Sequence, residues 1–306
     1  MAFTLGLDVG GTKVAAALVD ESGTIVVRTR HSTESHDYQA LVNGLVAAVE
    51  EACSDQTVGA VGLAIAGNVA ADGSRVLFSP HLPLAGEPLK RDLEHRLQRT
   101  VIVENDANAA AWAEYRYGGF GVGAGENGID DVLMVALGTG LGAGLVLDGQ
   151  LYRGSLGFAG EAGHMTVVRD GRVCPCGSRG CWERYASGTA LLGAYLERGG
   201  DPERSGPDIT AAAVSGDERA RQAISDIGDW LGHGLASLVA VLDPGVMVIG
   251  GGVSQAGDLL LGPARESFRR SLTGAGRRPE PPMVIAALGV DAGVIGAAAL
   301  AGQHEA

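Results

Sequence analysis

Two segments of this chain, 5–23 and 134–150, share one layout. Each is an apolar run, a glycine-rich turn, a second apolar run and then an aspartate close to a glycine. When the two are aligned, Gly10 falls on Gly138 and Asp20 falls on Asp148. Apolar runs joined by a glycine turn are typical of β-hairpins, and a hairpin that occurs twice predicts two related domains, each with its own sheet.

The rest of the chain alternates between helical and strand-like patterns. Between the hairpins, the patterns predict helices over 38–53, 88–98 and 106–118 and strands over 58–67 and 100–106. After the second hairpin, they predict helices over 187–198 and 218–242, a strand over 246–252, and a strand and helix within 283–301. This alternation predicts α/β layers, and the glycine-rich stretch 118–128 is the expected domain junction.

Charge and composition exclude two classes of partner. The 23 Lys and Arg residues face 36 Asp and Glu residues, and the formal charge of -13 repels the phosphate backbone of nucleic acids. No run approaches the roughly 20 apolar residues of a membrane helix, and the first residues lack the basic region and cleavage pattern of a signal peptide. We therefore expect a cytoplasmic protein without a nucleic-acid or membrane partner.

The first turn, Gly10-Gly11-Thr12-Lys13, has two interpretations. Glycine permits positive φ wherever a hairpin turns tightly, so the turn can be purely structural. However, Asp8 just before it offers a carboxylate to Mg²⁺, and backbone amides and the Thr12 hydroxyl can hold phosphate oxygens. A second loop of this kind, Gly138-Thr139-Gly140, favours phosphate binding.

Other glycine-rich nucleotide motifs fit poorly. The P-loop pattern, with its Gly-Lys-Ser/Thr ending, is missing from the sequence, also around Lys13. Gly138-x-Gly140-x-x-Ala143 matches the Rossmann pattern and follows a strand, but the residues after it continue as a strand and not as a helix. The match at Gly119-x-Gly121-x-x-Ala124 follows a helix and precedes polar residues. A nicotinamide-dependent dehydrogenase is therefore disfavoured.

Three of the four cysteines lie within eight residues. Cys174, Cys176 and Cys181 follow His164 closely, and together they offer one nitrogen and three sulfurs, a set typical of tetrahedral zinc. The alternative is three buried thiols and an unrelated histidine. Four protein ligands leave no open position for a substrate, so we expect a structural Zn²⁺.

Five motifs together resemble one known family, the ROK family of sugar kinases and repressors. They are Asp8-Val-Gly-Gly-Thr-Lys13, Glu104-Asn-Asp-Ala-Asn108, Leu137-Gly-Thr-Gly140, Glu161-Ala-Gly-His164 and Cys174-Pro-Cys-Gly-Ser-Arg-Gly-Cys-Trp-Glu183. Their order and spacing match over nearly the whole chain. The last motif is highly specific, whereas proteins with the actin and hexokinase type of fold share the two glycine loops more widely.

The resemblance implies a two-domain actin/hexokinase-like (ribonuclease H-like) α/β fold with a zinc-binding loop. The small domain would be 1–117, completed by the C-terminal helix at about 290–306, and the large domain 118–289 would carry the zinc motif. ATP and sugar would bind in the cleft between them. The resemblance also implies a homo-oligomer, a dimer or a tetramer.

The resemblance further implies ATP-dependent phosphorylation of the 6-hydroxyl of glucose. Asp106 would be the catalytic base. The remaining implied roles fall into two sets. The sugar would be held by Gly67, Asn68, Asn105, Asp106, Glu161, His164 and Glu183. The nucleotide and Mg²⁺ would be held by Asp8, Gly10, Gly11, Thr12, Lys13, Gly138, Thr139 and Gly140, with Gly250, Gly251 and Gly252 near adenosine.

The residue types suit these roles, although each has an alternative. Asp106 stands where a strand meets a helix, and a carboxylate there can take the proton of an attacking hydroxyl. An aspartate at this position can instead cap the helix, and Glu161 and Glu183 can be ordinary surface acids. The side chain of Lys13 can simply face solvent.

Two features leave the exact activity open. Many glucose kinases of this type have Asn where His81 stands, which leaves the contacts around the sugar uncertain. ROK repressors carry a DNA-binding segment before the first hairpin, and here the first strand is expected to start at about Phe3. The remaining alternatives are a kinase for fructose, allose, N-acetylglucosamine or N-acetylmannosamine, a kinase that uses polyphosphate, and a sugar-sensing regulator that does not bind DNA.

Overall fold

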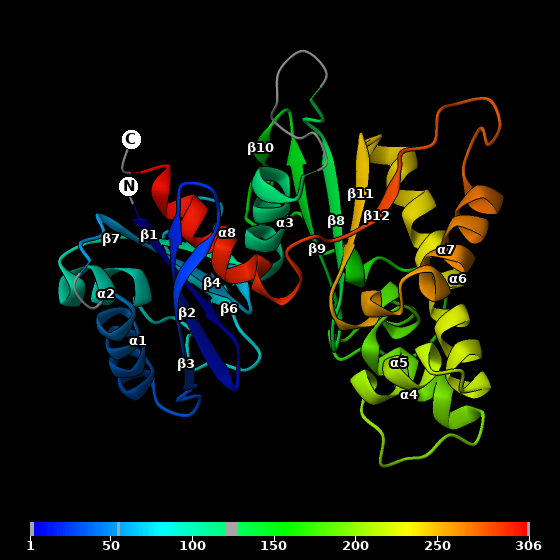
Figure 1. Cartoon of the computed structure of the whole chain (residues 1–306), viewed down its shortest axis with the longest axis horizontal. Helices are drawn as coiled ribbons and strands as arrows, with labels where there is room; N and C mark the ends of the chain where they lie inside the picture. Colours follow the sequence, from blue (N-terminus) through cyan, green and yellow to red (C-terminus); the bar gives the residue numbers. More distant parts are fainter. Residues whose placement is uncertain (1–2, 54–55, 120–127, 305–306) are drawn as a thin grey trace.

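The computed structural model describes residues 3–53, 56–119 and 128–304 (Figure 1). Most of the glycine-rich stretch predicted as the domain junction lies outside these ranges. Within them, two five-stranded sheets form the centre of the molecule. The α/β class predicted from the sequence is confirmed.

The first sheet has the order β3-β2-β1-β4-β7. Its strands are β1 (Phe3–Val9), β2 (Lys13–Asp20), β3 (Ile25–Ser32), β4 (Ala60–Ile65) and β7 (Thr100–Asn105). The hairpin of β1 and β2 is antiparallel, whereas β4 and β7 join it in parallel. The carboxyl ends of β1, β4 and β7 therefore meet at one edge, and this edge carries Asp8, Gly67 and Asp106.

The second sheet, with the order β10-β9-β8-β11-β12, repeats the first one strand for strand. Its strands are β8 (Val132–Leu137), β9 (Leu141–Leu147), β10 (Gln150–Leu151), β11 (Val246–Gly250) and β12 (Met283–Ile285). Again an antiparallel hairpin, here β8 and β9, is extended by two parallel strands. The duplication seen in the sequence is thus a duplication of the whole sheet.

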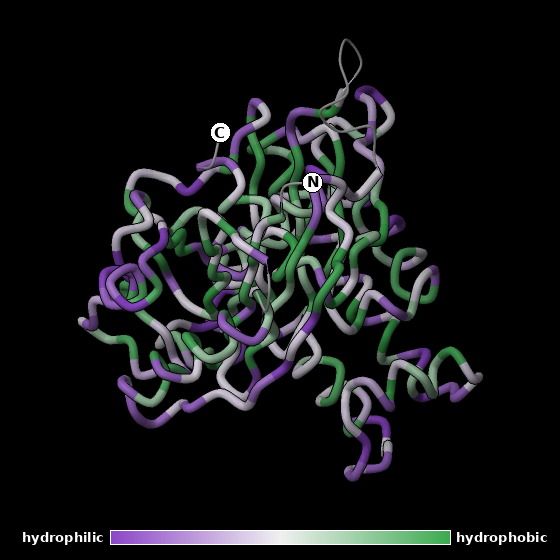
Figure 2. Tube along the Cα trace, turned by 60° about the vertical axis from the view of Figure 1, so that its left-hand side comes forward, coloured by the Kyte–Doolittle hydropathy of each residue, from purple (hydrophilic) through white to green (hydrophobic). Residues whose placement is uncertain are grey.

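Helices form the layers around and between the sheets (Figure 1). The first sheet packs on α1 (Tyr38–Cys53) and α2 (Leu89–Leu97), and the second packs on α4 (Gly188–Glu197), α5 (Gly206–Val214), α6 (Glu218–Leu242) and α7 (Asp258–Ser271). Between the sheets lie α3 (Asp106–Tyr117) and α8 (Ala292–Gly302). In Figure 2 the strands run through the centre largely in green, and hydrophilic turns lie around them.

Glycines bring α8 unusually close to its neighbours. A Cβ at Gly62 of β4 would overlap the carbonyl group of Ala297 in α8, and a Cβ at Gly296 would overlap the carbonyl group of Ala109 in α3. Only hydrogen fits at these contacts, so the helix lies directly on the sheet. The C-terminal helix therefore belongs to the packing of the first sheet, although most of the chain separates them in sequence.

The patterns missed several elements. The edge strand β3 (IVVRTRHS) alternates between half-buried and exposed residues, and its polar sequence resembles a loop. The short helix α5 depends on a capping box at Ser205, α7 contains Pro263, and β5 (Asn68–Val69) pairs with β6 (Val76–Phe78) only over a few residues. Over the described ranges, no helix combines the length and the apolar character that crossing a membrane requires.

Candidate active site

The turn from β7 to α3 assigns different roles to two neighbouring polar residues. Asn105 is the N-cap of α3, and its side chain accepts a hydrogen bond from the backbone N–H of Asn108 at 3.0 Å. Asp106 is the first helical residue, so it does not serve as the cap. The N-cap is therefore Asn105 and not Asp106, whose carboxylate accepts a hydrogen bond from the backbone N–H of Ala107 at 2.9 Å.

Two carboxylates with raised pKa values lie near each other at the edge of the first sheet. Burial raises the pKa of Asp106, and the negative charge of Glu161 raises it further. Hydrogen bonds from Ala107 and Asn105 act in the opposite direction and lower this pKa. Burial and the charge of Asp106 raise the pKa of Asp8 to about 6. Desolvation disfavours a charged carboxylate, so both groups bind protons more readily than exposed ones.

Residues predicted to hold a sugar form a continuous chain beside Asp106. The Asn105 amide donates to the Asp106 carboxylate and to the Gly67 carbonyl group, each at 3.0 Å. Asn68 donates to the Glu161 carboxylate at 2.5 Å. The other Glu161 oxygen lies 3.7 Å from Nε2 of His164. Neither Glu161 nor Asn68 is thus an isolated surface residue.

His164 joins this chain to the cysteine cluster. Its Nδ1 atom lies 3.8 Å from Sγ of Cys174 and 4.0 Å from the carboxylate of Glu183. Glu183 in turn lies 3.1 Å from the same sulfur atom, and a Cβ at Gly140 would lie 2.8 Å from its other oxygen. The Glu183 side chain therefore lies between the cysteines and the second glycine loop.

The four predicted zinc ligands converge on one point. Their ligand atoms, from His164, Cys174, Cys176 and Cys181, all lie within 4.8 Å of one another. The sulfur atoms of Cys176 and Cys181 are 3.6 Å apart. A tetrahedral zinc ion with bonds of about 2.0–2.3 Å needs ligands about 3.5–3.8 Å apart, so this donor set fits the ion. The buried Trp182, which donates to the Trp230 carbonyl group at 2.8 Å, anchors the loop.

Both glycine loops are held by backbone contacts. In the first, Gly10 donates to the Lys13 carbonyl group at 3.0 Å, and the Thr33 hydroxyl donates to the Gly10 carbonyl group at 2.7 Å. In the second, the start of α4 donates to Gly138 and Thr139 through Gly188 and Thr189. The second loop continues into β9, which excludes the Rossmann alternative because no helix follows it.

The remaining predicted nucleotide residues lie farther along the second sheet. Gly250 ends β11, and Gly251 has a positive φ of 83° where it packs on the backbone of Leu137. This close approach places Gly250-Gly251-Gly252 beside the start of the second glycine loop. Lys13 is exposed, and within the described residues its side chain makes no hydrogen bond or ion pair.

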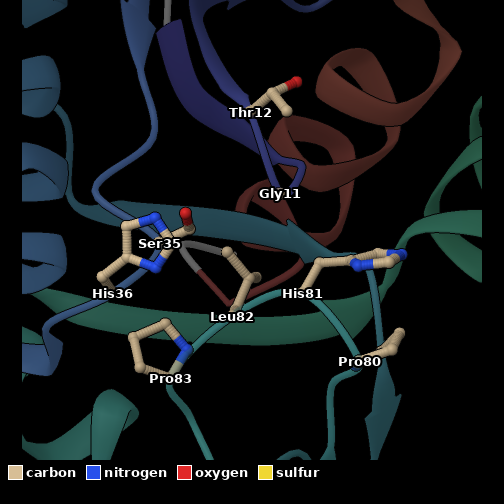
Figure 3. Close-up of a pocket in the computed structure, with 8 residues that line it drawn as sticks. All are labelled: Gly11, Thr12, Ser35, His36, Pro80, His81, Leu82 and Pro83. Carbon is tan, nitrogen blue, oxygen red and sulfur yellow. The ribbon is translucent and has the colours of Figure 1, made fainter.

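His81 lies against the first glycine loop. A Cβ at Gly11 would lie 2.6 Å from the His81 Cβ atom, so the histidine packs directly on the turn. Both residues line an open pocket of 620 Å³ with Thr12, Ser35 and His36, and with Pro80, Leu82 and Pro83 (Figure 3). The imidazoles of His36 and His81 lie on opposite sides of this pocket. His81, where many glucose kinases of this type have Asn, thus lies beside the predicted phosphate loop.

Sequence reasoning missed one charged contact of the site. Glu104 is 3% exposed, and its carboxylate accepts a hydrogen bond from Nε of Arg153 at 2.6 Å. Arg153 follows β10 of the second sheet, so no local pattern relates it to Glu104. The gathering of Glu104, Asn105 and Asn108 at one turn was the only available signal.

A duplicated sheet of this topology, with a half-buried carboxylate and two glycine loops beside it, defines a hexokinase-like α/β protein. The chain belongs to the ROK family, whose family model matches residues 4–304.

Its similarity to individual proteins extends over the full length. The glucokinase of Streptomyces coelicolor is 42% identical over 321 residues, which cover 100% of this chain and 99% of that protein. The crystal structure of a ROK family glucokinase from Streptomyces griseus in complex with glucose and AMPPNP has a TM-score of 0.87 and 43% identity, covering 99% of this chain and 100% of that one. A ROK hexokinase from Thermus thermophilus has a TM-score of 0.82 and 34% identity, with 99% of both chains covered.

Proposed function

We propose that this chain is an ATP-dependent glucokinase, which transfers the γ-phosphoryl group of ATP to the 6-hydroxyl of glucose. The observation that carries the proposal is the half-buried Asp106 carboxylate, which contacts Asn105 of the predicted sugar-binding set and lies close to Asp8. Full-length similarity to glucokinases, one of them crystallised with glucose and AMPPNP, supports the choice of glucose and ATP.

Asp106 has the properties of a general base for this transfer. Burial raises the pKa of Asp106 toward neutral pH, and a general base is most effective when its pKa lies near the pH at which the enzyme works. The carboxylate takes the proton of the 6-hydroxyl as the sugar oxygen forms its bond to the γ-phosphorus atom. The bond from that phosphorus atom to the bridging oxygen breaks, and ADP leaves with the electron pair.

The two glycine loops and Asp8 suit a magnesium nucleotide. Carboxylate oxygens are the ligands that Mg²⁺ prefers, and loop amides can bind phosphate oxygens. When bound, Mg²⁺ neutralises charge on the phosphates. We assign Asp8, Gly10, Gly11, Thr12 and Lys13 and the loop Gly138-Thr139-Gly140 to the phosphates, and Gly250-Gly251-Gly252 to adenosine. Glu183, which approaches Gly140, would then hold the sugar beside the second loop.

The cysteine cluster suits a structural Zn²⁺ that also orients the sugar site. Nδ1 of His164 faces Cys174, whereas Nε2 faces Glu161. With Nδ1 on the metal, Nε2 would carry the hydrogen and donate to a sugar hydroxyl. Zinc would thus fix the tautomer and direction of the imidazole ring.

The proposal includes an organisation of the whole chain. Residues 1–117 with the C-terminal helix would form the small domain and 118–289 the large domain, with the substrates held between them. A cytoplasmic location and a dimeric or tetrameric assembly remain predictions.

A panel of sugars and phosphoryl donors tests the proposed function directly. ADP release is measured with MgATP and glucose, fructose, N-acetylglucosamine, N-acetylmannosamine or allose, and glucose is also tested with polyphosphate. We expect the highest kcat/KM with glucose and ATP. A tenfold higher kcat/KM for another sugar would assign a different kinase activity, and no turnover with any pair would favour a sugar-sensing regulator.

A further inference from the structure

The Glu104 carboxylate connects the second half of the chain to the catalytic turn. It is nearly fully buried, with 3% of its side chain exposed. Among the described residues, its ion-pair partner is Arg153, whose Nε atom lies 2.6 Å away and whose side chain is 32% exposed. A buried carboxylate needs such a partner because burial removes the water that would otherwise stabilise its charge.

The other oxygen of Glu104 holds the turn itself. This atom, Oε1, accepts hydrogen bonds from the backbone N–H of Asn105 and from the side-chain amide of Asn108, each at 3.0 Å. Asn105 then donates to the Asp106 carboxylate at 3.0 Å. A continuous path of hydrogen bonds therefore runs from the Arg153 guanidinium group through Glu104 and Asn105 to the proposed base.

Arg153 also begins the segment that carries Glu161. We define this connecting segment as residues 152–161, between β10 and the 3₁₀ turn Ala162–His164. Ala159 donates to the Arg153 carbonyl group at 3.2 Å, and Gly157 packs against the backbone of Val69 to Ala71. The segment ends where Glu161 accepts a hydrogen bond from Asn68 at 2.5 Å. Arg153 thus anchors one end and Glu161 the other.

We propose that Arg153 is a positioning residue for phosphoryl transfer, which acts on Asp106 through the buried Glu104 carboxylate. The proposal rests on the proposed function, since it takes Asp106 as the base. Arg153 holds the Glu104 carboxylate in place, and Glu104 sets the position of Asn105 and hence of the Asp106 carboxylate. Because Arg153 lies on the connecting segment, the same ion pair aligns the base with the residue at the far end, Glu161.

Replacing Arg153 by Met removes the cation and keeps most of the apolar stem. We expect kcat for glucose to fall on the order of 10²-fold, because a small displacement of a catalytic group can cost that much. The KM for ATP should change little, since Arg153 does not reach the glycine loops. Arg153→Lys, which retains a positive charge but not the planar guanidinium group, should recover part of kcat.

A double variant separates positioning from general stability. In the double variant that combines Arg153→Met with Glu104→Gln, a neutral amide replaces the buried carboxylate. Its oxygen can still accept hydrogen bonds from Asn105 and Asn108. The double variant should therefore have a higher kcat than Arg153→Met alone, so the two effects are not additive. The control is Arg198→Met, which removes an ion pair of similar length with the more exposed Asp226, between the end of α4 and α6, and should leave kcat unchanged.

Melting temperatures show whether each variant is folded at the assay temperature, and Arg153→Lys and Glu104→Gln provide the test if Arg153→Met does not fold. The proposal would be overturned if folded Arg153→Met had an unchanged kcat, or if Arg198→Met lost as much kcat as Arg153→Met. It would also be overturned if the two single losses of kcat simply multiplied in the double variant. Wild-type protein that phosphorylates no sugar, or an Asp106→Asn variant of full activity, would instead contradict the proposed function. The two failures are therefore distinguishable.

Discussion

At the scale of single residues, the proposed chemistry depends on carboxylates that the fold partly removes from water. Asp106 is the most direct case, because the helix cap is Asn105 and Asp106 is the proposed base. Replacing Asp106 by Asn keeps the size of the side chain and removes the base. We expect kcat for glucose to fall by roughly 10²–10⁴-fold, with little change in glucose affinity by calorimetry. Near-normal kcat would show that Asp106 is not the base.

Asp8 allows a test of stability against pH. Its pKa of about 6 lies above the value of 3.8 for a free carboxyl, so the folded state binds the proton more tightly than the unfolded state. The free energy of unfolding therefore falls as the pH rises from about 4 to about 6, and the loss persists above pH 6. Asn has no charge to bury. At pH 8, without magnesium or nucleotide, Asp8→Asn should gain up to about 3 kcal/mol in the free energy of unfolding, while losing kinase activity.

Chemical denaturation at several pH values measures this difference. The gain should shrink toward zero as the pH falls below 3.8, where wild-type Asp8 becomes protonated in the unfolded state as well as in the folded state. Asp20→Asn is the control, because hydrogen bonds from Ser22 and Thr24 lower the pKa of this exposed carboxyl and its replacement should bring no gain. An equal gain at pH 3.5 and pH 8 would show that ionisation of Asp8 is not the cause.

At the scale of structural elements, His164 lies between the cysteine loop 174–181 and the proposed sugar site. Cys176 lies at the exposed side of the cluster, and its sulfur atom faces Cys181 at 3.6 Å. Cys176→Ser should lose bound zinc and weaken glucose binding at least tenfold, because the imidazole ring of His164 loses its fixed direction. ATP binding should change much less.

Metal analysis and calorimetry with glucose and ATP test this coupling. Cys53→Ser is the matched control, since Cys53 is buried in the first half of the chain, where it contacts Arg99 at 3.4 Å. It should keep both zinc and glucose affinity. If zinc-free Cys176→Ser remains folded by circular dichroism and binds glucose normally, the metal only holds a surface loop.

At the scale of the whole molecule, the proposed site is divided between the two halves of the chain. The base and Asn68 belong to the half with the first sheet, whereas Glu161, His164 and Glu183 belong to the other. Glucose binding should draw the halves together, because both must contact the sugar and water must be kept from the γ-phosphate. Small-angle scattering should show a smaller radius of gyration with glucose, and hydrogen exchange should slow near Gly67 and Glu161. A sugar that is not phosphorylated is the control, and identical profiles with and without glucose would count against closure.

Local patterns in the sequence were enough for most elements and for the chemical composition of the site. The helix at 38–53 and the helix at 218–242 begin and end as predicted, because their amphipathic spacing is repeated over several turns. The four candidate zinc ligands, which the structure brings together, and the Glu104–Asn108 turn could be singled out because their members lie close together in the chain. The hairpin repeat likewise predicted a duplicated sheet, since strand pairing across a short turn is local.

Tertiary structure alone decided which distant residues meet. The edge strand β3 is stabilised by pairing with β2 and not by its own polar sequence, and α8 reaches the first sheet through close contacts at Gly62 and Gly296. Arg153 pairs with Glu104 across 49 residues. Such contacts depend on how the two sheets and the helices between them pack, and a periodicity or a short motif contains no information about packing between segments far apart in the chain. The sequence by itself therefore determined most of the elements and the reactive groups, whereas packing determined that Glu104 is buried and that Arg153 is its partner.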